Sequence, residues 1–370
     1  MKKWCIIPFF VPHQGCPHTC VFCNQQRISG VFSAGPSSLE VSTQIGQYLK
    51  TIPVDCRVEV AFYGGSFTGL PWERQRELLQ PAYQAWEAGQ VDGIRISTRP
   101  DLINPKILER IKALGVTTVE LGVQSLDPEV LEVAQRGHGP EVVEKAVNFI
   151  RQAGMKLGLQ MMIGLPGDNR ERSYKTVSQI IKLQPDFVRI YPTLVIRHTV
   201  LERMFHQNDY TPLELDEAVE WTKILYLHLV AQDIPVIRMG LQTTEELLKP
   251  GEVVAGPWHP AFGELVQAAV ALEQIEVLLK QWIREHPFCP KPLTTNTGLV
   301  TLLLIINPRY GSRVVGQHQR NFQHILKKWK VKFKLQTNDS IPVRDLILKD
   351  DENTGKITLN WQEFLANYRI

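Results

Sequence analysis

The sequence predicts an α/β fold, a partial (β/α)6 barrel of the TIM type, followed by a small α+β domain. Strand-like apolar stretches alternate with helical stretches as far as residue 191, an order typical of parallel strands joined by right-handed crossovers. Six strand–helix units can be counted in that stretch, fewer than the eight of a closed barrel. Beyond residue 260 the regular alternation ends, which indicates a different kind of domain.

The elements of the barrel follow from the spacing of the apolar residues. Short runs that alternate predict strands, and apolar residues that recur every three or four positions predict helices. The expected strands are residues 4–11, 57–63, 94–98, 117–123, 156–163 and 187–191. The expected helices are residues 39–51, 71–88, 105–114, 128–134, 141–153 and 171–183. The loops that follow parallel strands meet at one face of a barrel, so the active site is expected there.

The rest of the chain predicts an appendage to this barrel. A helix at 213–233 and a short strand at 235–241 complete a first domain over residues 1–242. Residues 243–262, rich in glycine and proline, are expected to be a linker to a domain over 263–370. The elements expected there are helices at 264–284 and 317–329, strands at 299–307 and 330–335, and a hairpin over 343–359.

The composition is that of a globular protein, with 370 residues of which 44% are hydrophobic and 21% are charged. Because no apolar run has the length of a membrane span and no secretion signal is recognisable, a cytoplasmic protein without membrane contact is expected. The formal net charge of +3 is unevenly distributed. Residues 307–334 contain eight lysines and arginines and no aspartate or glutamate.

Three of the six cysteines, Cys16, Cys20 and Cys23, have the spacing CxxxCxxC directly after the first expected strand. Thiolates are the ligands that iron–sulfur clusters and zinc prefer. Three ligands on a cluster of four irons leave one iron open for a substrate or cofactor. Zinc would need His13 or His18 as a fourth ligand. The spacing favours the cluster, and zinc remains the alternative.

The motif CxxxCxxC, with Phe22 directly before the third cysteine, resembles the signature of the radical S-adenosylmethionine (SAM) enzymes. The resemblance implies a [4Fe–4S] cluster whose open iron binds SAM. It also implies reductive cleavage of SAM to a 5′-deoxyadenosyl radical, with an electron donor such as flavodoxin or ferredoxin. The fold that it implies is again a partial barrel.

The same resemblance implies residues that surround SAM. Phe22 and Asn24 would lie beside the adenine. Gly64 and Gly65, after the second strand, are similar to the motif that binds the amino group of SAM. A plain turn is the alternative interpretation of this glycine pair.

Two further cofactor residues are expected after the fourth strand. Gln124, in the sequence GVQS, would contact the ribose or methionine part of SAM, and Arg136, in QRGH, would pair with its carboxylate. For Arg136 a solvated position near a helix end is the alternative. Ser97 and Gln160 stand where related enzymes often carry a glutamate on the third strand and an aspartate on the fifth.

Five motifs in order resemble the catalytic subunit of Elongator and its short bacterial relatives: CPHTCVFCNQQRISG, FYGGSFTG, STRPD, ELGVQS and RIYPTLVIR. The resemblance covers about residues 6–242 and implies modification of the wobble uridine of tRNA. The acyl-CoA loop of the family's acetyltransferase domain has no match in this sequence. The sequence therefore supports the radical domain of that family and does not support acetyl transfer.

The basic segment 307–334 is a candidate contact for tRNA, because neutralised phosphates add affinity. Lys330, Lys332 and Lys334 alternate along one expected strand, and an edge strand protected by lysines is the alternative interpretation. Two other hypotheses stay open. One is a zinc-stabilised RNA-binding protein without catalysis, and the other is a radical SAM enzyme for a small molecule such as a porphyrinogen.

Overall fold

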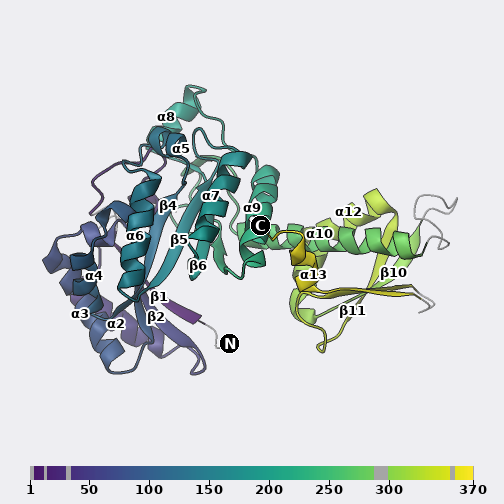
Figure 1. Ribbon diagram of the computed structural model, residues 1–370, viewed down its shortest axis with the longest axis horizontal. Helices are drawn as coiled ribbons and strands as arrows, with labels where there is room; N and C mark the ends of the chain where they lie inside the picture. Colours follow the sequence, from purple (N-terminus) through teal and green to yellow (C-terminus); the bar gives the residue numbers. More distant parts are fainter. Residues whose placement is uncertain (1–3, 12–14, 31–34, 287–298, 351–354, 370) are drawn as a thin grey trace. The chain divides into compact units, whose positions relative to one another are not determined.

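The computed structural model describes residues 4–11, 15–30, 35–286, 299–350 and 355–369 (Figure 1). The chain forms two compact units, the first from residues 1–218 and 234–260 and the second from 219–233 and 261–370. The segment expected as a linker thus belongs for the most part to the first unit. Within the described ranges, no helix combines the length and the apolar character needed to cross a bilayer.

A seven-stranded parallel sheet is the frame of the first unit. Its strands, in spatial order, are β1 (Trp4–Val11), β2 (Arg57–Gly64), β3 (Gly93–Thr98), β4 (Val116–Gln124), β5 (Lys156–Ile163), β6 (Phe187–Pro192) and β8 (Val236–Met239). This curled sheet confirms the predicted partial barrel. The short strand expected after the six units is its seventh member, because β8 pairs with β6.

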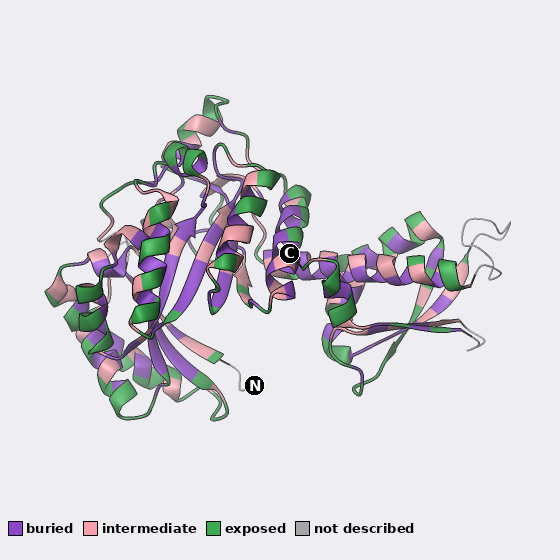
Figure 2. Cartoon of the chain, in the orientation of Figure 1, coloured by how far each residue is buried: buried purple, intermediate pink, exposed green. Residues whose placement is uncertain are grey.

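Helices alternate with these strands and pack against them (Figure 1). They are α2 (Ser38–Leu49), α3 (Trp72–Glu87), α4 (Pro105–Lys112), α6 (Pro140–Gln152) and α7 (Arg170–Lys182). The next helix, α9 (Leu215–Ala231), belongs from Val219 onward to the second unit. Side-chain caps fix where some begin: Asn104 accepts a hydrogen bond from the Ile107 amide, and Asn169 accepts one from Arg172, both at 3.0 Å. The strands are largely buried and the outer helix faces exposed, as Figure 2 shows.

Short elements in the loops shape the carboxyl end of the sheet. They are α1 (Gln25–Ser29), η1 (Phe67–Gly69), η2 (Pro100–Leu102), α5 (Pro128–Val133), β7 (Val195–Ile196), α8 (Val200–His206) and β9 (Val253–Ala255). β7 and β9 pair antiparallel. Arg27 of α1 forms ion pairs with Glu246 at 2.8 Å and Glu252 at 2.7 Å. These contacts attach the segment 243–260 to the helix that follows the cysteines.

The second unit is an α+β arrangement with a four-stranded sheet in the order β11-β10-β12-β13. Its main elements are α10 (Phe262–Glu285), β10 (Val300–Ile306), α12 (Arg320–Trp329), β11 (Val331–Thr337), β12 (Leu346–Asp350) and β13 (Lys356–Leu359). Shorter elements are η3 (Pro308–Tyr310), α11 (Gly311–Val315), η4 (Gln317–Gln319) and α13 (Trp361–Ala366). β10 and β11 are parallel, and the other two pairs are antiparallel. The small α+β region predicted after the barrel is therefore present.

Candidate active site

Two neighbouring cavities lie at the carboxyl end of the large sheet. The first, of about 100 Å³, is lined by all three cysteines of the motif, Cys16, Cys20 and Cys23. The second, of about 190 Å³, shares Phe22, Cys23 and Gln124 with the first. Loops after β1, β2, β3 and β4 contribute to the first cavity, so the structure gathers motifs that lie far apart in the sequence.

The sulfurs of Cys16 and Cys23 each have an uncharged polar side chain as neighbour. The Sγ of Cys16 lies 3.1 Å from the hydroxyl oxygen of Ser66, and the Nε2 of Gln25 donates to the Sγ of Cys23 at 3.5 Å. Cys20 is the most buried of the three, with 5% exposure. Hydrogen bonds to sulfur stabilise thiolate ligands and tune the potential of a metal centre.

Two arginines surround the sulfur of Cys20. Arg136 approaches it with Nη1 at 3.4 Å, and Arg99 approaches it with Nη1 at 3.8 Å. Arg99 also donates to the carbonyl oxygen of Arg136 and pairs with Asp101 at 2.9 Å. Both arginines are buried, so they place positive charge beside a ligand that becomes anionic when it binds a metal. Arg99 was not expected as a site residue from the sequence, although it lies in the motif STRPD.

Burial and, to a smaller extent, the neighbouring Cys20 and Cys16 raise the pKa of Cys23 to about 12. The thiol of Cys23 is therefore neutral at ordinary pH without a bound cation. Metal binding requires the thiolate, and the positive charge of a metal centre removes the proton.

Gly64 sits where the chain passes directly over the end of β1. Its φ is +111°, and a Cβ on this residue would lie 2.7 Å from the carbonyl oxygen of Val11. The amide of Gly65 donates to that same carbonyl at 2.8 Å. Both glycines line the first cavity, and Gly64 also lines the second. The close approach explains why a residue without a side chain is needed at position 64.

Gln124 is aimed into the cavities by an irregularity at the end of β4. The pairing of β4 with β5 shifts register between Gly122 and Gln124, and Gln124 has a φ of +69°. Its Oε1 accepts a hydrogen bond from Gln160 at 2.8 Å. Bulges often redirect a side chain at a functional site. The two glutamines expected from the sequence thus form one pair.

Phe22 lines the two cavities, whereas Asn24 does not. Phe22 is buried with 9% exposure and lines both cavities. Asn24 caps α1 by accepting a hydrogen bond from the Arg27 amide at 3.3 Å, and it donates to the carbonyl of Arg197 at 3.2 Å. It is not among the residues that line the two cavities, unlike its neighbour Gln25.

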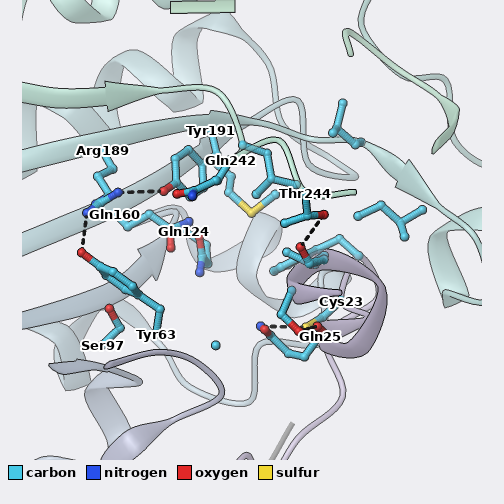
Figure 3. Close-up of a pocket in the computed structure, with 18 of the residues that line it drawn as sticks. Cys23, Gln25, Tyr63, Ser97, Gln124, Gln160, Arg189, Tyr191, Gln242 and Thr244 are labelled. Carbon is cyan, nitrogen blue, oxygen red and sulfur yellow. Dashed lines mark hydrogen bonds between the residues drawn. The ribbon is translucent and has the colours of Figure 1, made fainter. Parts of the chain in front are cut away.

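The second cavity has a polar wall whose residues were not expected from the sequence as site residues (Figure 3). Arg189 of β6 donates to the hydroxyl oxygens of Tyr63 at 3.0 Å and Tyr191 at 3.3 Å. Its Nε lies 2.7 Å from a carboxylate oxygen of Glu120. The signal available in the sequence was the alternation of Arg189 and Tyr191 in RIYP, which places both side chains on the same side of a strand.

The residues around the first cavity fit an iron–sulfur cluster with a polar cofactor. Three sulfurs from one loop face it, and two guanidinium groups offset the charge of thiolates. The Nε of Arg136 and the Oγ of Ser97 are buried and have no hydrogen-bond partner among the described residues. Buried polar atoms are normally satisfied, so each is a candidate contact for a ligand.

The residues around the first cavity fit a single metal ion less well than they fit a cluster. Across the part of the chain that the structure describes, no three His, Cys, Asp or Glu side chains form a group that could hold a metal ion. Ligands of a four-iron cluster each hold a different iron, so they do not have to converge on one point. His18 lies against Gly137, and His13 falls outside the described residues.

Two family models match the chain. The model described as "Radical SAM superfamily" matches residues 10–180, and the "Radical_SAM C-terminal domain" matches residues 185–273. Together they cover the large sheet from the end of β1 onward and the beginning of α10.

Curated relatives include proteins named tRNA uridine(34) acetyltransferase. The one from Methanocaldococcus jannaschii is 29% identical over 58% of this chain and 47% of its own length. The one from Methanocaldococcus infernus is 31% identical over 55% of this chain and 46% of its own length. Elongator complex protein 3 from Saccharomyces cerevisiae is 30% identical over 49% of this chain and 37% of its own length. The chain spans about half the length of the tRNA uridine(34) acetyltransferases that it matches.

A solved structure has the same fold. The archaeal Methanocaldococcus infernus Elp3 with an N-terminal deletion superposes with a TM-score of 0.56 at 23% identity, and the match covers 79% of this chain and 65% of that one. Together with the two family models and the cysteine loop at the end of a partial barrel, this fold leads to one conclusion. The chain belongs to the radical SAM superfamily of enzymes and resembles the radical domain of the Elongator catalytic subunit.

Proposed function

We propose that this chain is a radical SAM enzyme that holds a [4Fe–4S] cluster on Cys16, Cys20 and Cys23 and modifies the wobble uridine of tRNA. The observation that carries the proposal is the lining of the first cavity, which contains the three cysteines and two buried arginines. The second cavity lies next to it. The choice of tRNA rests on the relatives named tRNA uridine(34) acetyltransferase. Their acetyl transfer is not part of the proposal.

The first cavity would take SAM. Arg136 would bind the carboxylate of SAM through its unpartnered Nε, and the backbone at Gly64 and Gly65 would bind the amino group. Gln124, held by Gln160, would contact the ribose or methionine part.

The adenine would lie against Phe22, whose ring is buried between the two cavities. Asn24 would act through α1, because it caps the helix whose first residue, Gln25, lines both cavities.

A reduced cluster at this site would supply the electron that cleaves SAM to methionine and a 5′-deoxyadenosyl radical. The chain itself would contribute the lining of this cavity of about 100 Å³, which comes from the cysteine loop, the glycines and the ends of the neighbouring strands. The electron would come from a donor such as flavodoxin or ferredoxin. That donor and a tRNA substrate place the proposed reaction in the cytoplasm.

Part of the basic segment 307–334 is paired within the second unit. Arg313 forms an ion pair with Glu264 at 3.3 Å, and Lys328 forms one with Glu276 at 2.7 Å. Both glutamates lie on α10. The charge of +8 counted along the segment is therefore partly neutralised by residues outside it.

Lys332 and Lys334 lie on the opposite face of β11 from Phe333, since neighbours in a strand alternate. The ring of Phe333 lies 5.5 Å from that of Phe322 in α12. The two lysines are therefore on the sheet face turned away from α12.

The strand register extends this basic face across the whole small sheet. Lys334 pairs with Leu303, Leu303 pairs with Lys349, and Lys349 pairs with Lys356. Paired residues share a face, so these lysines and Lys332 form one basic face, which would contact tRNA phosphates.

Mass spectrometry of tRNA nucleosides tests the proposed function. Cells that lack this chain are expected to lose one modified nucleoside at the wobble position. The wild-type chain should restore it, and Cys20→Ala should not. Cys5→Ala is the matched control, because Cys5 lies within β1 outside both cavities. An unchanged nucleoside profile would contradict the tRNA assignment and favour a small-molecule substrate.

A further inference from the structure

The wall of the second cavity contains a pair of phenols held by one arginine (Figure 3). Arg189 is largely buried, with 11% of its side chain exposed, and it reaches Tyr63 and Tyr191 with different nitrogens. A guanidinium group can only donate hydrogen bonds. Both phenol oxygens therefore act as acceptors toward Arg189, and the hydroxyl hydrogen of each must point elsewhere.

Neither hydroxyl donates to an acceptor among the described residues, and both tyrosines line the cavity. Burial raises the pKa of Tyr63 to about 12, so this phenol keeps its proton at ordinary pH. Each phenol carries one O–H donor. The cavity therefore has two donors on one wall, oriented by a shared arginine.

The charges behind this wall cancel. Glu120 lies 2.7 Å from Arg189 and 3.3 Å from Arg95, and Arg95 in turn pairs with Glu59 at 2.5 Å. The side chains of these two arginines and two glutamates are between 3% and 11% exposed. Their formal charges sum to zero. Moving an anion from water into such a site without a countercharge costs roughly several kcal/mol of desolvation free energy. The wall therefore suits a neutral oxygen acceptor better than a carboxylate or a phosphate.

We propose that the hydroxyl groups of Tyr63 and Tyr191 together bind a neutral carbonyl oxygen of the substrate in the second cavity. Arg189 is the positioning residue that fixes both rings. The inference rests on the proposed function and adds the chemical group that the cavity recognises. Two sources offer this chemistry, the uracil ring of the wobble uridine and the carbonyl of an acyl thioester.

Binding measurements on the reconstituted full chain, without reductant, test the phenol pair. The two probes are an anticodon stem–loop with uridine at the wobble position and acetyl-CoA. Tyr63→Phe and Tyr191→Phe each remove one O–H donor and keep the ring. Each variant should bind one of the two probes about tenfold more weakly, the loss typical of one hydrogen bond, and should bind the other like the wild type. The affected probe identifies the source of the carbonyl.

Tyr83→Phe is the matched control, because Tyr83 lies in α3, where its hydroxyl donates to Glu87. It should bind both probes like the wild type. Arg189→Lys keeps the positive charge but cannot hold both phenols, so it should weaken the same probe as the tyrosine variants.

The proposal is overturned if either tyrosine variant binds both probes with wild-type affinity, or if the wild type binds neither. A wild-type protein that binds a probe but forms no 5′-deoxyadenosine with reductant would count against the proposed function alone. The two failures are therefore distinguishable.

Discussion

Arg136 donates a hydrogen bond from Nη1 to the sulfur of Cys20 at 3.4 Å, across 116 residues of sequence. Its Nη2 donates to the carbonyl oxygen of Gly122. One side chain thereby connects the loop before α6 with the cysteine loop and the end of β4. The remaining Nε has no partner among the described residues and is the donor that we assign to the carboxylate of SAM.

Arg136→Gln is expected to weaken SAM binding to the reconstituted protein about 10- to 100-fold. A hydrogen bond to a charged group contributes about 1.5–3 kcal/mol, and glutamine cannot supply the charge. Isothermal titration calorimetry measures the effect. Arg76→Gln, at an exposed arginine of α3 that pairs with Glu73, should leave the affinity unchanged. Equal affinities for all three proteins would refute the assignment of Arg136.

Gly64→Ala is expected to reduce the free energy of unfolding by about 1–3 kcal/mol, because a positive φ and a close carbonyl both oppose a Cβ. Gly46→Ala is the control. A Cβ at Gly46, within α2, would meet nothing within 4 Å, and alanine there should stabilise the helix by about 0.5–1 kcal/mol. Urea unfolding of the two variants should give changes of opposite sign. A neutral Gly64→Ala would show that the passage over Val11 is not constrained.

The pH dependence of stability should contain a contribution from Asp168. Burial raises the pKa of this carboxyl to about 6, although it accepts hydrogen bonds from Ser173 at 2.8 Å and from the Gly164 amide at 2.9 Å. The folded chain then holds a proton that the unfolded chain has lost, so stability falls as pH rises from about 4 to about 6.

Urea unfolding over this pH range, compared with Asp168→Asn, measures the contribution. The expected difference in slope amounts to a change on the order of 1 kcal/mol across the window, discounted for the partial exposure of the side chain. Parallel pH profiles for the two proteins would contradict the raised pKa.

Charge reversal on the basic face should weaken tRNA binding. The triple variant Lys332→Glu, Lys334→Glu, Lys356→Glu is expected to bind at least tenfold more weakly, and its affinity should fall less steeply with salt, by about one unit of slope per lost contact. The control is a triple reversal at exposed lysines of the first unit, Lys106, Lys145 and Lys182.

The control changes the net charge by the same amount, so any difference reports the location of the lysines. Filter binding at several salt concentrations gives both quantities. Equal losses for the two triple variants would show that the basic face has no specific role and that its lysines only protect a sheet edge.

The barrel was predictable because its strands are short apolar runs and its helices have clear apolar stripes. The predicted strand at 4–11 and the predicted strand at 156–163 match β1 and β5. Short elements such as α1, β7 and β9 were not predicted. They are stabilised by distant partners, for example Arg27 with Glu246, and such pairs have no local pattern.

The cysteine motif could be recognised from its spacing alone, and the residues that surround it could not. Arg99 and Arg189 meet their partners only after the strands have aligned, since Cys20 and Tyr63 lie 79 and 126 residues away from them. The charge counted along the segment 307–334 overstated the positive charge of that surface for the same reason. The acidic partners Glu264 and Glu276 come from a helix outside the segment.

Anaerobic reconstitution with iron and sulfide, followed by assay of 5′-deoxyadenosine, tests the central claim most directly. The wild type and Cys5→Ala are expected to take up about four irons and to form 5′-deoxyadenosine from SAM when reductant is added. Cys16→Ala, Cys20→Ala and Cys23→Ala should each lose this activity. A wild-type protein that binds zinc but takes up no iron and sulfide, or that forms no 5′-deoxyadenosine, would contradict the claim.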